Sequence, residues 1–116
     1  MAGLSSLARV YALAAPGANT DILTTGITPQ YDGVFIVTVA LTTGSIFNVT
    51  STDGSTSYTV GLNASTALNA GDAYTFCFGV RTGITYNFQV ETDSAIRWLN
   101  VLHAIDAVGL NSAQGA

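Results

Sequence analysis

The stretch that decides the fold is YTFCFGVRTGITYNFQVE, residues 74–91. Successive side chains of a strand point to opposite faces of a sheet, so alternation of apolar and polar residues indicates a half-buried strand. Residues 74–80 place Tyr, Phe, Phe and Val on one face, and residues 84–90 repeat this alternation after a short turn at 81–83. The pattern predicts two strands that form a hairpin, each with its aromatic side toward a core.

The rest of the chain has the same two-residue period. Further strands are expected at residues 7–13, 22–27, 34–41, 46–50, 57–62 and 95–105. Residues 34–41 are apolar on both faces, which is typical of a central strand covered on both sides. Residues 95–105 contain no Gly or Pro and could also form a helix, but the β-rich context and the lack of helix caps favour a strand. Asp53-Gly54 predicts a tight hairpin between 46–50 and 57–62, because Gly accepts positive φ.

Short strands at roughly ten-residue spacing predict an all-β protein, either an antiparallel β-sandwich or a jelly-roll-like barrel of about seven or eight strands. The length of 116 residues supports a single domain. We expect an N-terminal arm at residues 1–8, the sandwich domain at 9–108 and a C-terminal tail at 109–116, where the periodicity ends.

Charged side chains are unusually scarce. They make up 9% of the chain, lysine is absent, and three arginines stand against seven carboxylates, which gives a net charge of −4. Binding to nucleic acid needs several cations acting together, and a membrane span needs about 20 apolar residues in succession, so neither partner is expected. Charges also protect exposed sheet edges from pairing. Their scarcity predicts self-association, with a trimer as the expected state and a monomer as the alternative.

The chain offers little catalytic chemistry. His103 is the only histidine and Cys77 the only cysteine, so an intrachain disulfide is excluded. A nucleophile–base pair would have to join His103 to Cys77 or to one of the scattered serines, and the Cys77/His103 pair is left open. Cys77 lies between Phe76 and Phe78 in a strand, as a packed thiol does, and we expect His103 at a rim or interface. The acidic residues fall mostly at turns, where Asp bonds nearby backbone. We expect no enzyme activity, no cofactor and no metal site.

Three stretches carry a resemblance to a known family. They are residues 9–23, with RVY followed by PGANTDIL, residues 35–48 (FIVTVALTTGSIFN), and residues 68–76 (LNAGDAYTF) with 85–91 (TYNFQVE). Together they resemble the small decoration, or cement, proteins on the heads of tailed bacteriophages. The resemblance implies a β-sandwich, often trimeric, that sits on the outer surface of the virion. There it would stabilise the capsid by bridging subunits of the major capsid protein. It assigns no role to an individual residue.

Interface candidates are terminal residues, three aromatic residues and the single histidine. They are Met1, Ala2, Gly3, Leu4, Tyr11, Tyr31, Trp98, His103, Gly109 and Leu110. One alternative function is a carbohydrate-binding or adhesion module with Tyr11, Tyr31 and Trp98 as its platform, although most other aromatic residues occupy core-directed positions. Another is a different virion component, such as a tail, spike or minor capsid protein.

Overall fold

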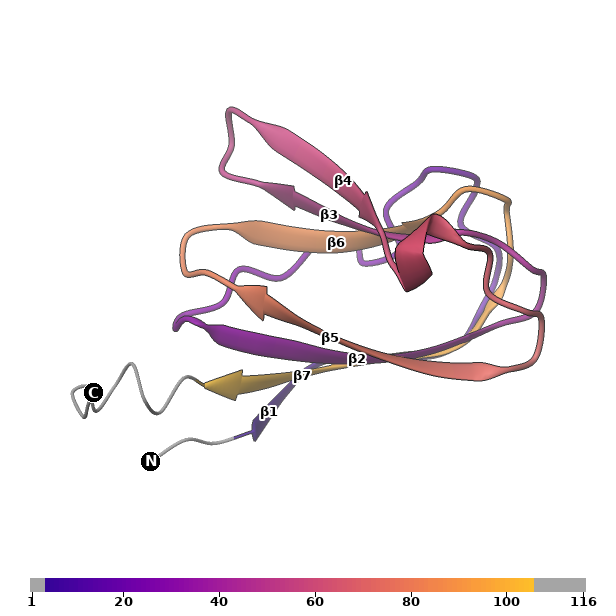
Figure 1. The fold of residues 1–116 in the computed structure, drawn as a ribbon, viewed down its shortest axis with the longest axis horizontal. Helices are drawn as coiled ribbons and strands as arrows, with labels where there is room; N and C mark the ends of the chain where they lie inside the picture. The colour runs from indigo at the N-terminus through magenta and orange to yellow at the C-terminus, as the bar shows by residue number, and fades with distance from the viewer. Residues whose placement is uncertain (1–3, 106–116) are drawn as a thin grey trace.

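A computed structural model describes residues 4–105, which form two packed antiparallel sheets (Figure 1). The strands are β1 (Leu4–Leu13), β2 (Gly33–Leu41), β3 (Phe47–Thr52), β4 (Ser57–Gly61), β5 (Ala73–Val80), β6 (Thr85–Val90) and β7 (Ile96–Ile105). A short 3-10 turn, η1 (Asn63–Ser65), follows β4. Within the described range, no helix has the length and apolar character needed to span a membrane.

The strand order confirms the predicted β-sandwich. One sheet has the order β1-β7-β2-β5 and the other β4-β3-β6, and every neighbouring pair is antiparallel. Residues 96–105 form strand β7, which confirms the prediction of a strand instead of a helix. Strand β7 lies between β1 and β2. The predicted Asp53-Gly54 hairpin is also present, because β3 pairs with β4 from Thr52 and Ser57 onward.

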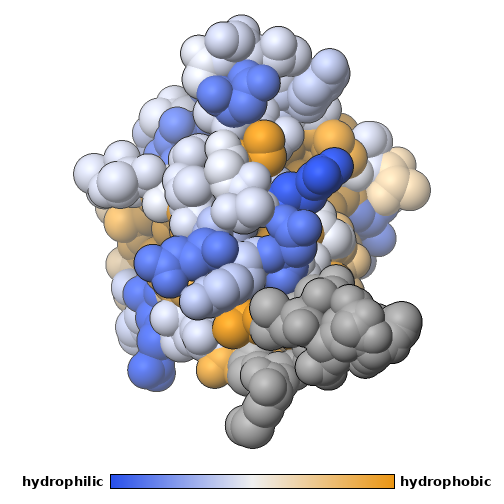
Figure 2. Space-filling model, turned by 90° about the vertical axis from the view of Figure 1, so that its left-hand side faces the viewer, coloured by the Kyte–Doolittle hydropathy of each residue, from blue (hydrophilic) through white to orange (hydrophobic). Residues whose placement is uncertain are grey.

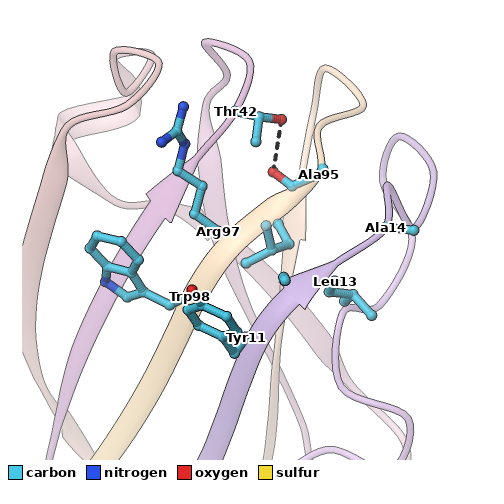
Figure 3. A pocket seen from close by; sticks show the side chains of 9 residues that line it. Tyr11, Leu13, Ala14, Thr42, Ala95, Arg97 and Trp98 are labelled. Carbon is cyan, nitrogen blue, oxygen red and sulfur yellow. Dashed lines mark hydrogen bonds between the residues drawn. The ribbon is translucent and has the colours of Figure 1, made fainter.

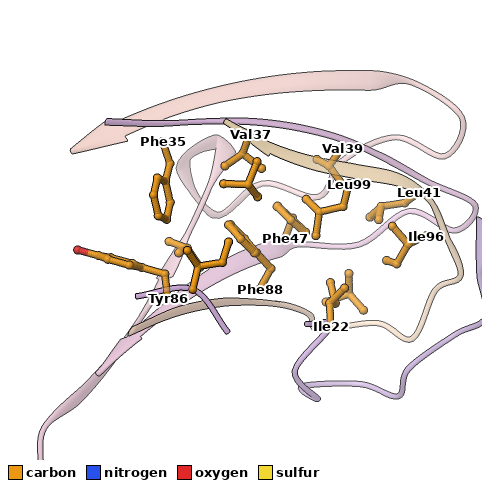
Figure 4. Close-up of a cluster of buried hydrophobic side chains, with 14 of the residues drawn as sticks. Ile22, Phe35, Val37, Val39, Leu41, Phe47, Tyr86, Phe88, Ile96 and Leu99 are labelled. Atoms are coloured by element: carbon orange, nitrogen blue, oxygen red, sulfur yellow. The ribbon is translucent and has the colours of Figure 1, made fainter. Parts of the chain in front are cut away.

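The core lies between the two sheets (Figure 4). Besides Leu68, its fully buried large side chains come from β2, β3, β6 and β7 and are Phe35, Val37, Val39, Leu41, Phe47, Phe88, Val90, Ile96, Leu99 and Val101. The rings of Phe47 and Phe88 stack with their centroids 5.5 Å apart. Burying each such side chain contributes about 1.5–3 kcal/mol, so this layer is the main source of stability.

Residues 74–90 form two strands, as predicted, but these strands do not pair with each other as a hairpin would. Strand β5 pairs with β2, whereas β6 pairs with β3, so the connection at 81–84 crosses from one sheet to the other. The inward aromatic faces were predicted correctly, and they explain the arrangement. Strands in opposite sheets can pack ring against ring, as Phe78 and Tyr86 do with centroids 6.5 Å apart, whereas strands in one sheet cannot face each other.

The strand predicted at residues 22–27 does not form. This segment instead runs irregularly beside β6, with the Ile22 N–H donating to the Phe88 carbonyl at 2.9 Å. Ile27 and Tyr86 then exchange two backbone hydrogen bonds of 2.8 and 2.7 Å. Gly26, with φ of 71°, turns the chain out of the extended conformation just before that bridge. Ile22 and Ile27 are nevertheless buried, so the segment closes the core next to β6.

Residues 4–8 of the N-terminal arm expected at 1–8 belong to strand β1 instead. Strand β1 begins at Leu4, and residues 4–8 pair with β7 through Leu4↔Ala104, Ser5↔His103 and their successors. Residues 1–3 and 106–116, which include the expected tail, lie outside the described residues.

Candidate functional site

The outer face of the four-stranded sheet carries three of the predicted interface residues, Leu4, Tyr11 and Trp98. The strand register places its side chains in rows that cross β1, β7, β2 and β5 in turn. The rows are Leu4, Ala104, Val34 and Gly79; Ser6, Leu102, Ile36 and Cys77; Arg9, Asn100, Thr38 and Thr75; and Tyr11, Trp98, Ala40 and Ala73. The face is mostly apolar at both ends, and its polar row contains Arg9, which is the only charged residue in these rows.

The described residues do not cover this face. Tyr11 is 84% exposed and Leu4 66% exposed, while Val34 and Ile36 are half-buried. The prediction that residues 34–41 are covered on both sides is therefore wrong for the described part of the chain. Strand β2 has β7 and β5 as neighbours, and their side chains shield its outer face only partly. Leu4 and Tyr11 lie at opposite ends of the face, so each end carries one strongly exposed large side chain.

Tyr11 and Trp98 lie opposite each other on β1 and β7 and form the aromatic end of the face (Figure 3). A hollow of about 500 Å³ lies along this pair and is bordered by Arg9 and Asn100 as well. A second hollow of about 450 Å³ continues past Trp98 to Arg97 and the edge of the sheet. Both hollows are lined by the two aromatic rings, and each has one guanidinium group, with the Asn100 amide in the first.

An irregularity in both strands shapes this end. The register passes from Leu13↔Ile96 to Tyr11↔Trp98, which leaves Ala12 and Arg97 as the intervening residues. Ala12 has φ of 54°, a left-handed conformation that is unfavourable for a residue with a Cβ. The Thr42 hydroxyl donates to the Ala95 carbonyl at 3.2 Å beside it (Figure 3).

Tyr31, the third residue of the predicted platform, lies elsewhere. It precedes β2 in the chain, whereas Trp98 pairs with Ala40 at the far end of that strand. Seven residues of strand separate Gly33 from Ala40, a distance of about 23 Å at 3.3 Å per residue. The structure therefore brings Tyr11 and Trp98 together and leaves Tyr31 apart.

His103 was expected at a rim or interface, and the structure places it in the core instead. It is 4% exposed, and its ring packs edge-on against Phe35 with centroids 5.5 Å apart. The register pairs Phe35 with His103 and Ile36 with Cys77, so the two candidate catalytic residues lie on opposite faces of the sheet. Cys77 is exposed on the outer face. The two side chains cannot act as a nucleophile–base pair within one chain.

Three aspartates accept backbone N–H groups, but only Asp53 accepts them from nearby residues, as the sequence predicted, whereas Asp93 and Asp32 bond to distant segments. Asp93 Oδ1 accepts the Gly17 N–H at 2.8 Å, and Asp32 Oδ1 accepts the Thr82 N–H at 2.8 Å. In the β3–β4 turn, the Ser55 and Thr56 N–H groups both donate to Asp53 Oδ1 at 2.8 Å, and these bonds lower the pKa of that carboxyl group. Among residues 4–105, no three His, Cys, Asp or Glu side chains gather as metal ligands would.

The end of the sandwich that carries the β3–β4 and β5–β6 turns has a different surface (Figure 2). Residues of intermediate hydropathy predominate there, with strongly hydrophilic residues and smaller hydrophobic groups among them. This mixture is typical of a solvated surface.

Strand β4 exposes two large residues that the interface prediction missed. Tyr58 is 66% exposed and Val60 is 55% exposed, although both lie on the inward face of their sheet. The alternation in residues 57–60 correctly places the two side chains on one face, but it predicts that they are buried. That prediction fails because a sequence pattern does not show whether the opposite sheet extends far enough to cover them.

Of the other interface candidates, Met1, Ala2, Gly3, Gly109 and Leu110 lie outside the described residues. The chain matches no protein-family model, and no curated protein is significantly similar to it in sequence. The geometry of the fold and its exposed surfaces therefore carry the functional argument.

Proposed function

We propose that this chain is a non-enzymatic structural protein of a virion, which decorates the outer surface of a capsid and stabilises it by bridging subunits of the major capsid protein. The outer face of the four-stranded sheet is the docking surface in this proposal. Binding that favours the assembled shell over its separated subunits stabilises the shell by mass action.

The observation that carries the proposal is the exposed Tyr11–Trp98 end of that face, next to Arg9. Tyr, Trp and Arg are the residue types that contribute most to binding at protein interfaces. The resemblance of residues 9–23, 35–48, 68–76 and 85–91 to phage decoration proteins supports the choice of a capsid as the partner. Apolar burial should dominate the contact, because the rows of this face contain a single charge.

The test uses capsids of the virus that encodes the chain, assembled without it, and the purified protein. Wild-type protein should cosediment with the capsids and saturate at a fixed ratio to the capsid protein. Retention should change little up to about 1 M salt, where exposed charges are screened beyond about 3 Å. Tyr11→Ala or Trp98→Ala should weaken binding at least tenfold, whereas Tyr31→Ala, at an exposed aromatic residue away from the face, should not. Absence of saturable binding would overturn the proposal.

A carbohydrate-binding module is the second candidate, because two aromatic rings, Arg9 and Asn100 border one hollow. Aromatic rings stack on sugar rings, and amide and guanidinium groups bond to hydroxyls. A glycan array separates the candidates. Binding to one class of glycan that is lost in Trp98→Ala would favour this second function, and an array without signal would exclude the glycans it carries.

A further inference from the structure

The two sheets of the sandwich are offset. The Phe47 ring on β3 lies over the Phe76 ring on β5, with centroids 6.4 Å apart and planes 21° apart, so β3 faces β5 across the core. Strand β4 is the neighbour of β3, while β5 is the last strand of its own sheet. Strand β4 therefore extends beyond β5 and has no described strand beneath it.

The exposed side chains agree with this offset. Val60 pairs with Val49 and Tyr58 pairs with Ser51, so both point to the inner side of the sheet. Val49 is buried, yet Val60 and Tyr58 are more than half exposed, as expected for inward residues with nothing below them. The inner side of β4 is therefore open at Tyr58 and Val60.

The free edge of β5 is unprotected. Proteins usually guard such edges with charges, prolines or bulges. Neither residues 73–80 nor residues 57–61 contain a charged residue or a proline, and the β2–β5 register runs without interruption. An added strand would find unpaired backbone groups on one side and apolar side chains above it, which is the usual setting for recognition by strand addition.

Because the sheets are offset, strand β1 at the other edge of the larger sheet also lacks a facing strand. It is the opposite edge of the same sheet, and Figure 1 shows β1 and β4 at opposite extremes of the molecule. Its inward residues Ala8, Val10 and Leu13 pack against the core but stay half-buried, because the smaller sheet does not extend over them. Thus β4 has no described strand beneath its inner side, and no strand of the smaller sheet lies over the inner side of β1.

We propose that β1 of a second copy of this chain adds to the β5 edge and lies beneath β4. The contact pairs two free edges at once, and it covers Tyr58 and Val60 of one copy with Ala8 and Val10 of the next. The register is irregular at Leu7, so Ala8–Tyr11 is the regular stretch expected to pair. Such a head-to-tail contact generates a closed ring when its rotation closes. This inference goes beyond the proposed function, because it concerns contacts between copies and requires no capsid.

Crosslinking to the native cysteine tests the geometry. Cys77 lies on the outer face of β5, and in the added strand Ser6, Arg9 and Tyr11 would share that face. We expect Ser6→Cys, Arg9→Cys or Tyr11→Cys to give a disulfide-linked dimer under mild oxidation. Within one chain, β1 and β5 are three strand spacings apart, about 14 Å, which exceeds the roughly 7 Å limit between the Cα atoms of a disulfide.

Two controls define the background of this experiment. Ser55→Cys places a thiol in the exposed β3–β4 turn and should add no dimer beyond that of wild type. Adding Cys77→Ser to each β1 variant should abolish the specific product. Dimer at the wild-type level in all three β1 variants would overturn the proposal.

A pair of substitutions on β4 tests the energetics. Val60→Lys puts a charge on the inner face of β4, and Thr59→Lys puts the same charge on the opposite face of the same strand. By sedimentation at about 10 µM, wild type and Thr59→Lys should self-associate alike, and Val60→Lys should raise the Kd at least tenfold with unchanged circular dichroism. A monomeric wild type, or equal effects of the two lysines, would overturn this mode of self-association. Because the isolated protein is used, such a failure is distinguishable from a failure to bind capsids.

Discussion

Asn87 on β6 holds Leu23 by two hydrogen bonds that mimic a strand pairing. Its Oδ1 accepts the Leu23 N–H at 3.0 Å, and its Nδ2 donates to the Leu23 carbonyl at 2.8 Å. The same Oδ1 also accepts the N–H of Phe88 at 2.8 Å. This buried amide therefore joins the backbone hydrogen bonds of Ile22 and Ile27 in holding the irregular segment beside β6.

Asn87→Ala should lower the free energy of unfolding by about 2–3 kcal/mol, because it leaves partly buried backbone groups without partners. Gln89→Ala is the matched control, since Gln89 makes one exposed hydrogen bond to Asp21, and its loss should cost less than about 0.5 kcal/mol. Urea denaturation measures both. Equal costs would show that Asn87 does not anchor the segment.

Gly26→Ala should destabilise the fold more than Gly54→Ala. Both glycines have positive φ, 71° and 97°, which costs a residue with a Cβ about 1–2 kcal/mol. A Cβ on Gly26 would also lie 2.9 Å from Thr85 Cγ2 and 3.1 Å from the Tyr86 carbonyl oxygen, whereas a Cβ on Gly54 meets nothing within 4 Å. Thermal unfolding of the two variants checks the order, and a lower Tm for Gly54→Ala would contradict it.

His103→Leu should leave stability unchanged or increase it. The buried Nε2 of His103 has no hydrogen-bond partner in the described part of the chain, and an apolar residue of similar volume removes that cost. His103→Ala should instead cost about 2–4 kcal/mol, because it leaves a cavity beside Phe35. Chemical denaturation compares the two variants. A similar loss in both would mean that the imidazole makes a contact that leucine cannot replace.

The β3–β4 turn should loosen in acid. Hydrogen bonds from the Thr56 and Ser55 N–H groups lower the pKa of Asp53, so folding favours the ionised form. Its contribution is therefore present above the ordinary Asp value of about 3.9 and is lost as pH falls through the lower pKa of the folded state. Amide shifts of Ser55 and Thr56, followed by NMR, should titrate below that value, and Asp53→Asn should abolish the titration. A midpoint at or above the ordinary value would contradict the assigned hydrogen bonds.

Period-two alternation determined the class of the fold, because burial on one side of a strand acts on every second residue. It identified the inward Phe88 and Val90, and the β-rich context correctly favoured a strand over a helix at residues 96–105. It also placed Tyr11 and Trp98 among the interface candidates. Each of these inferences depends on side chains near one another in the chain or on composition alone.

Only the tertiary structure decided which strands are partners and which faces stay uncovered. The pattern at residues 74–90 is the same whether two strands pair within a sheet or face each other across a core, and the packing of Phe78 on Tyr86 selects the second arrangement. The pattern at Val60 is that of a buried residue, yet the offset of the sheets leaves it exposed. Alternation shows on which face of a strand a side chain lies. Whether that side chain is buried depends on which segment lies opposite it, and contacts between residues distant in sequence determine which segment that is.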